Sequence, residues 1–86
     1  MTRRGEEKAR LEARKHNARK RVEMLTRRER DVLVRVVEGD SNKEIAQHLG
    51  ISPRTVEIHS SGMLSRLNAR STADAVRIGL HSGLLD

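Results

Sequence analysis

The stretch from Pro53 to Leu67 carries side chains whose chemistry suits contact with duplex DNA. On a helix that turns about 100° per residue, its larger apolar residues gather on one side. The opposite side holds Arg54, Glu57, Ile58, Ser61 and Ser65. An arginine can donate two hydrogen bonds to guanine, and a branched apolar side chain can contact a thymine methyl group. This face could therefore read base edges, although an exposed isoleucine is also common as an isolated surface residue.

The composition excludes several other kinds of chemistry. The 86 residues include no Cys, Trp, Tyr or Phe. Without cysteine there is no disulfide framework and no thiolate zinc site, and without aromatic rings there is no stacking platform for single-stranded nucleic acid. No apolar run approaches the roughly 20 residues that span a bilayer. We expect no cofactor, no metal, no membrane association and a cytoplasmic location.

The histidines and serines do not form a catalytic or metal-binding pattern. His16, His48, His59 and His81 show no i,i+4 pairing, so a metal site is not expected. A serine nucleophile needs a positioned base and a pocket, and a domain this small offers little concavity for either. We therefore predict that the chain is not an enzyme.

Start and stop signals divide residues 26–86 into four helices. Thr26 with Glu29, and Ser41 with Glu44, fit the capping box. Two further helices start at Ser52, which precedes a proline, and at Ser71. Terminating residues stand at Gly39, Gly50, Asn68 and Gly83. The signals predict an all-α fold with helices over residues 27–38, 42–49, 53–67 and 72–82.

Each helix presents one apolar stripe that predicts its buried side. The expected core consists of Leu25, Leu33, Val36, Val37, Ile45, Leu49, Ile51, Val56, Met63, Leu64, Leu67, Ala73, Val76, Leu80 and Leu84. Ile78 falls off the stripe of the last helix. With Asp74 and His81 on neighbouring turns, it could form a self-complementary patch for a weak homodimer.

Residues 1–25 form a basic helical linker or tail before the domain of residues 26–86. This segment holds 9 Lys and Arg against 4 Asp and Glu, net +5, whereas residues 26–86 carry net +1. Good helix formers dominate the segment, but its heptad pattern is weak. A solvated linker helix is favoured over a coiled coil, and the charge could add non-specific contact with the DNA backbone.

The turn Gly50-Ile51-Ser52 joins two predicted helices in the helix-turn-helix layout, in which the second helix enters the major groove. An ordinary helical corner would have the same turn. The residues around it decide between these interpretations.

Three stretches resemble the LuxR/FixJ-type DNA-binding domain of response regulators. They run from Leu25 to Leu33, from Gly39 to Ala46 and from Leu49 to His59. The resemblance implies a four-helix transcriptional regulator of two-component systems, with its third helix in the major groove and its fourth often at a dimer contact. It also implies base-facing roles for Arg54, Glu57, Ile58 and Ser61, and phosphate-facing roles for Lys43, Thr55, His59 and Ser65.

The sequence departs from the family pattern in two places. Ser60-Ser61-Gly62 replaces the basic or bulky polar residues usual after the histidine, and Gly62 costs about 1 kcal/mol inside a helix. The resemblance would place a receiver domain before the linker, and the 86 residues show no such pattern, so we expect either a fragment of a longer regulator or a small regulator controlled by other means. The alternatives to a sequence-specific DNA-binding regulator are a protein-interaction module on the same scaffold and a sigma-factor-like promoter-reading domain. A regulator would also have RNA polymerase as a candidate partner.

Overall fold

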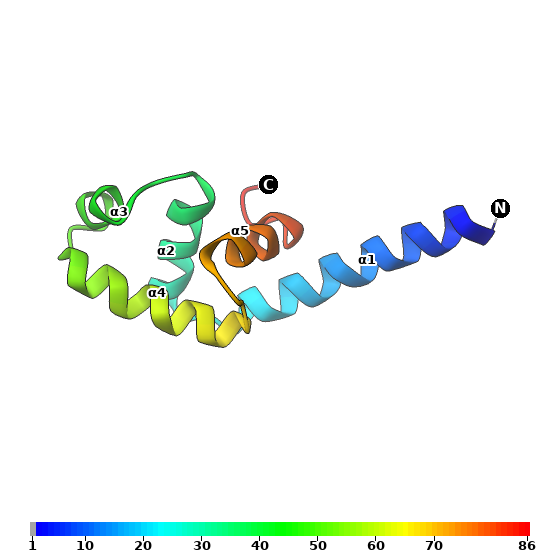
Figure 1. Cartoon of the computed structure of the whole chain (residues 1–86), viewed down its shortest axis with the longest axis horizontal. Helices are drawn as coiled ribbons and strands as arrows, with labels where there is room; N and C mark the ends of the chain where they lie inside the picture. Colours follow the sequence, from blue (N-terminus) through cyan, green and yellow to red (C-terminus); the bar gives the residue numbers. More distant parts are fainter. Residues whose placement is uncertain (1) are drawn as a thin grey trace.

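The computed structural model describes residues 2–86, and within them every regular element is an α-helix (Figure 1). The five helices are α1 (Thr2–Glu23), α2 (Arg27–Val37), α3 (Asn42–Leu49), α4 (Pro53–Leu67) and α5 (Thr72–His81). Helices α2–α5 form one unit, and α1 extends from it as a long arm (Figure 1). The molecule measures 52 × 20 × 19 Å along its principal axes. The predicted all-α class and the helix before the four-helix unit are confirmed.

The predicted helix starts are confirmed by the hydrogen bonds of their caps. At α2 the Glu29 N–H donates to Thr26 Oγ1 at 3.1 Å, and the Thr26 N–H donates to Glu29 Oε1 at 3.0 Å. Ser41 and Glu44 form the same reciprocal pair at α3. Each hydroxyl satisfies a backbone donor that has no partner inside its helix, so local sequence alone fixes where these helices begin.

The helices also end close to the terminating residues predicted from the sequence. Gly50 and Asn68 adopt left-handed conformations after α3 and α4, with φ of 67° and 53°. Helices α2 and α5 end at Val37 and His81, one residue earlier than predicted. Ends of helices fray, and a difference of one residue does not alter the packing.

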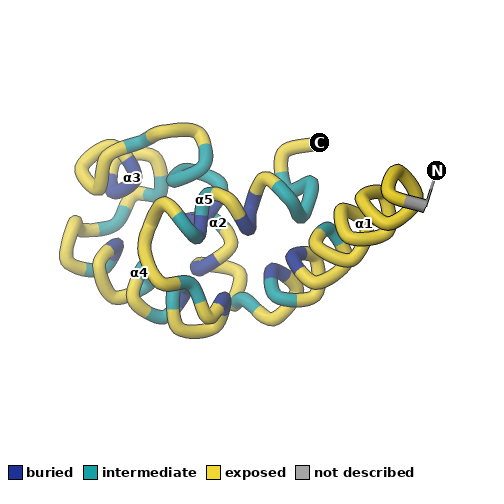
Figure 2. Tube along the Cα trace, turned by 45° about the vertical axis from the view of Figure 1, so that its right-hand side comes forward, coloured by how far each residue is buried: buried dark blue, intermediate teal, exposed yellow. Residues whose placement is uncertain are grey.

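The core lies where α2, α3, α4 and α5 meet, and α1 contributes to it. Its largest fully buried side chains are Val32, Leu33, Ile45, Val56, Met63 and Leu67. The last two turns of α1 add Ala18 and Val22, which are 5% and 4% exposed. Figure 2 shows buried positions at this end of α1, whereas the remainder of the arm is mainly exposed. The linker helix is therefore anchored by its C-terminal part.

The predicted buried face of α5 is wrong. Ala75, Ile78 and Gly79 are buried, whereas Leu80 is 58% exposed and Ala73 is exposed. Contacts with two other helices determine which face of α5 is buried. Helix α1 packs on α5, and α2 approaches so closely that a Cβ at Gly79 would lie 2.8 Å from Val37 Cγ2. The prediction treated α5 without α1 and so chose the wrong stripe.

Candidate nucleic-acid interface

The predicted base-facing side of α4 is exposed throughout. Arg54, Glu57, Ser61 and Ser65 are exposed, and Ile58 is 61% exposed. The opposite side of the helix is anchored in the core by Val56, Met63 and Leu67. The helical period thus separated the two faces correctly, and an apolar side chain at the centre of a polar face is left open to solvent.

The α3–α4 turn fixes the direction in which this face points. The Ile51 N–H donates to the Ala46 carbonyl at 3.0 Å, and the Ile51 side chain packs against the core. Ser52 then caps α4 by accepting from the Thr55 N–H at 3.1 Å. Because Gly50 supplies the left-handed residue that reverses the chain, α3 and α4 form a helix-turn-helix pair.

The predicted phosphate-facing residues are distributed over α3 and α4. Lys43 is exposed in the first turn of α3, and Ser65 is exposed in the C-terminal part of α4. Thr55 and His59 are half-buried beside the exposed face of α4. The Thr55 hydroxyl lies 2.9 Å from the Ser52 hydroxyl, so it is positioned by the cap.

A shallow hollow of about 290 Å³ runs along one flank of α4. Its lining includes the predicted base-facing residues Glu57 and Ser61, together with Ser60, Asn42 of α3 and apolar Met63. The small side chains of Ser60 and Ser61 leave this hollow open. The other predicted base-facing residues, Arg54 and Ile58, lie outside it.

The three predicted dimer residues do not form an exposed patch. Ile78 is only 2% exposed because it lies in the cleft between α5 and α1, which His81 also lines. Asp74 Oδ2 accepts from the Arg70 N–H at 3.0 Å, and its Oδ1 accepts from Arg77 Nη2 at 2.8 Å. The backbone hydrogen bond from Arg70, followed by the bond from Arg77, lowers the pKa of Asp74 below its ordinary value. The prediction that Ile78 offers an accessible apolar contact is therefore wrong.

One ion pair that ties α4 to α2, between a buried carboxylate and a half-exposed guanidinium, was not predicted. Glu29 is 5% exposed, and its Oε1 accepts from Arg66 Nε at 2.7 Å in addition to the capping bond from Thr26. Its Oε2 lies against Gly62, where a Cβ would collide with it. Gly62 thus makes room for the carboxylate that ties α2 to α4. From the sequence, Glu29 was predicted only as part of a helix cap, and Gly62 only as a residue that lowers the stability of its helix.

A second polar cluster joins α2 to α3. Asp40 in the connecting loop has Oδ2 at 3.6 Å from Arg35 Nη1 and at 3.6 Å from His48 Nε2. The Asp40 side chain is 16% exposed, and its buried Oδ2 has no hydrogen-bond partner among the described residues, because both contacts at 3.6 Å are longer than hydrogen bonds. The cluster helps to set the position of α3 relative to α2.

The geometry agrees with a comparison to known protein families. The model for bacterial regulatory proteins of the luxR family matches residues 23–78. The chain belongs to the luxR family. This match covers α2, α3 and α4 completely, and most of α5.

Similar luxR-family proteins include transcriptional regulatory proteins named FixJ. The FixJ of Azorhizobium caulinodans is 41% identical over 81 residues, which are 94% of this chain and 38% of that protein. The FixJ of Rhizobium meliloti is 44% identical over 68 residues, 79% of this chain and 33% of that protein. This chain thus spans less than half the length of these relatives.

A solved luxR-family structure has the same arrangement of helices. Full-length FixJ from B. japonicum superposes with a TM-score of 0.82 at 35% identity, and the match covers 99% of this chain and 42% of that one. The agreement therefore includes α1 as well as the four-helix unit. None of the helices over residues 2–86 has both the length and the apolar composition that crossing a membrane requires.

Proposed function

We propose that this chain binds specific sequences of duplex DNA through the exposed face of α4 and thereby regulates transcription. The observation that carries the proposal is an open polar face with Ile58 at its centre, presented by the second helix of a helix-turn-helix pair. A second helix presented in this way fits the major groove, where side chains of its first turns reach base edges. Membership of the luxR family supports this function over a sigma-factor-like domain.

Base reading is assigned to the exposed face of α4. Arg54 stands in the first turn and can donate two hydrogen bonds to guanine, and Ile58 lies one turn further along. Glu57 can accept from cytosine N4, and the Ser61 hydroxyl can bond to either kind of base edge. These four side chains read sequence, so substituting them changes preference more than overall affinity.

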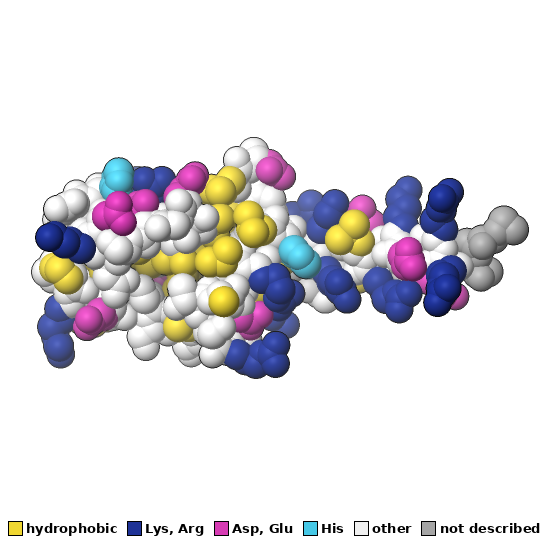
Figure 3. All heavy atoms as spheres, turned by 45° about the horizontal axis from the view of Figure 1, so that its top comes forward, with side chains coloured by type: hydrophobic (Ala, Val, Ile, Leu, Met, Phe, Trp, Pro, Cys, Tyr) yellow, Lys and Arg dark blue, Asp and Glu magenta, His cyan; other side chains and the backbone are white. Residues whose placement is uncertain are grey.

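Phosphate contacts are assigned to residues that flank this face. Lys43 on α3, with Thr55, His59 and Ser65 on α4, would position the domain on the backbone without reading sequence. With net +1 over residues 26–86, this set is modest in charge. The basic arm α1 supplies additional electrostatic attraction, and Figure 3 shows Lys and Arg side chains around it.

Selection of bound duplexes from a random oligonucleotide pool tests this function. We expect the full chain to enrich one sequence motif and to bind that motif at least tenfold more tightly than random duplex at physiological salt. Enrichment without any motif, or binding that disappears completely at moderate salt for all sequences, would contradict sequence-specific recognition.

The alternative is a protein-interaction module, favoured by the hollow beside α4. Apolar Met63 and Leu64 line it, together with the short side chains of Ser60 and Ser61. A helix or loop of another protein could dock there. The two functions separate in the selection experiment, because a module of this kind would enrich no DNA motif.

We further propose a weak homodimer, now through the outer face of α5. Leu80 is 58% exposed, and Val76 is half-buried one turn before it. Figure 3 shows apolar side chains gathered in a strip across one face of the four-helix unit. Paired copies would bind half-sites about one helical turn of DNA apart. Sedimentation of Leu80→Asp on a two-site duplex should show loss of paired binding, and unchanged pairing would exclude this face.

Residues 26–86 form the DNA-binding unit, and α1 is a linker that docks on it through Ala18 and Val22. RNA polymerase is a proposed partner, which copurification on promoter DNA would test. We assign no enzymatic activity to the chain, and we propose a cytoplasmic location.

A further inference from the structure

The cleft between α1 and α5 concentrates positive charge in a way that the DNA-reading face does not explain. It encloses about 130 Å³, and three arginines, one histidine and an asparagine amide line it, with Ala18 and Ile78 at its floor. No carboxylate is among the lining residues, all of which belong to the described part of the chain. Asp74 lies outside the lining and accepts from Arg77, and the other lining donors remain, so this concave site suits an anion.

The spacing of charges along α1 produces this cleft. On a helix, an acid stabilises an arginine when it stands three or four residues away. The positions three and four residues from Arg14 and from Arg21 hold only Arg, Leu, Asn, Ala and Met. Because Arg14, Asn17 and Arg21 follow one another at three- and four-residue intervals, they share the face of α1 that packs on α5.

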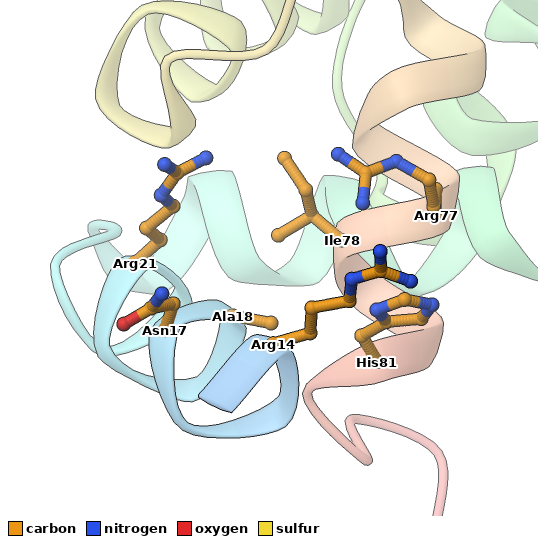
Figure 4. A pocket seen from close by; sticks show the side chains of 7 residues that line it. All are labelled: Arg14, Asn17, Ala18, Arg21, Arg77, Ile78 and His81. Atoms are coloured by element: carbon orange, nitrogen blue, oxygen red, sulfur yellow. The ribbon is translucent and has the colours of Figure 1, made fainter. Parts of the chain in front are cut away.

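The structure shows which donors remain available in the cleft. Arg77 donates to Asp74 through Nε and Nη2, which leaves its Nη1. Arg21 donates to the Leu67 carbonyl through Nη1 at 3.3 Å, which leaves its Nε and Nη2. Arg14 forms no ion pair in the structure of residues 2–86. In Figure 4, Arg21 and Arg77 extend from the two helices on either side of Ile78, and Arg14 lies beside His81.

We propose that this cleft is a binding site for a phosphate group, which would hold α1 against α5. The tetrahedral oxyanion matches the chemistry because the arginine forks can donate to several oxygens at once. Binding would also relieve the repulsion among the cationic side chains that α1 and α5 bring together. The phosphate group belongs either to a small phosphorylated ligand or to the backbone of bound DNA, and both sources offer the same group to the same donors.

Titration of the full chain with inorganic phosphate tests the site. Ionic strength is kept constant with sodium chloride, and binding is followed by NMR through the methyl resonances of Ala18 and Ile78, which line the cleft. We expect saturable shifts in the parent protein and affinity about tenfold weaker in Arg14→Gln, the loss of one charge-assisted hydrogen bond. Arg21→Gln should weaken binding to a similar extent.

Arg3→Gln is the matched control because it removes the same charge from the same helix. Arg3 is exposed and lies eleven residues before Arg14, about 16 Å along the helix axis. The affinity of the Arg3→Gln variant for phosphate should stay within about twofold of the parent value. Absence of saturation in the parent, or an equal loss in Arg3→Gln and Arg14→Gln, would overturn the proposal. Far-UV circular dichroism confirms that each variant is folded.

Measuring the affinity of the same variants for duplex DNA identifies the source of the phosphate. If the DNA backbone occupies the cleft, Arg14→Gln weakens duplex affinity more than Arg3→Gln does, and inorganic phosphate competes at constant ionic strength. If a small ligand occupies it, the two variants bind duplex equally while their phosphate affinities differ. Either result supports the site, and neither depends on whether α4 reads a specific sequence.

Discussion

Replacing Gly62 with alanine should destabilise the protein, although alanine is the better helix former. Gly62→Ala gains about 1 kcal/mol of helix propensity. The new Cβ, however, would occupy the space of Glu29 Oε2. The carboxylate can avoid it only by moving, and its Oε1 then leaves Thr26 N at 3.0 Å and Arg66 Nε at 2.7 Å.

The size of the effect follows from what the carboxylate loses. The capping bond contributes about 1 kcal/mol, and the Arg66 pair contributes about 1 kcal/mol because Arg66 is 51% exposed and solvent screens it. A buried carboxylate left short of partners adds about 1–3 kcal/mol. After the gain in propensity, the free energy of unfolding should fall by about 2–4 kcal/mol, which lowers Tm by about 8–32 °C for a domain of this size.

A double-mutant cycle followed by thermal melting isolates this cause. In a Glu29→Ala background the obstacle is absent, so Gly62→Ala should become neutral or stabilising by about 1 kcal/mol. Gly5→Ala is the matched control, because nothing lies within 4 Å of a Cβ at that position of α1, and it should only raise helicity. If Gly62→Ala alone stabilised the protein, the carboxylate would not depend on the space at Gly62, and this account of the α2–α4 contact would be refuted.

Three further predictions concern packing, pH and the arm. Gly79→Ala should cost about 1–3 kcal/mol in denaturant unfolding, because the added Cβ would lie 2.8 Å from Val37 Cγ2; an unchanged midpoint would show that α2 and α5 separate easily. The backbone and then the side-chain hydrogen bond of Ser41 lower the pKa of Glu44 from its ordinary value of 4.5, so its contribution to stability is present above about pH 4.5 and is lost as the pH falls through the lower folded-state pKa. Glu44→Gln should therefore flatten the pH dependence of melting in this acidic window, and an identical profile would exclude the effect. Replacing exposed Arg4 and Lys8 with glutamine should reduce the salt dependence of binding to random duplex and leave sequence preference intact. An unchanged salt dependence would show that these two side chains of α1 do not contact DNA.

The parts of the fold that could be predicted from sequence are those set by neighbouring residues. Thr26 and Glu29, three residues apart, fix the start of α2 through their own hydrogen bonds. The exposed position of Ile58 likewise follows from the helical period once the core residues of α4 are known. Both depend on contacts within one helix or its cap, so no knowledge of tertiary packing was needed.

The parts that could not be predicted depend on contacts between distant segments. Ile78 is buried because Ala18 and its neighbours on α1 cover it, about 60 residues away in the sequence. Gly62 has its explanation in Glu29, an acid whose ion pair with Arg66 spans 37 residues. The periodicity of one helix carries no information on which other helix will pack against it. The weak apolar pattern of residues 1–25 also gave no indication that α1 would reach the core.

The central claim is that the exposed face of α4 reads bases, and motif selection with single variants tests it most directly. Parent protein, Arg54→Ala, Ile58→Ser and the control Arg10→Ala would each select from the same random duplex pool. The account predicts that Arg54→Ala loses about 1–3 kcal/mol of discrimination at one guanine, that Ile58→Ser loses preference at a neighbouring thymine, and that Arg10→Ala keeps the parent motif. If all four proteins returned the same motif with unchanged melting temperatures, α4 would not read DNA through this face.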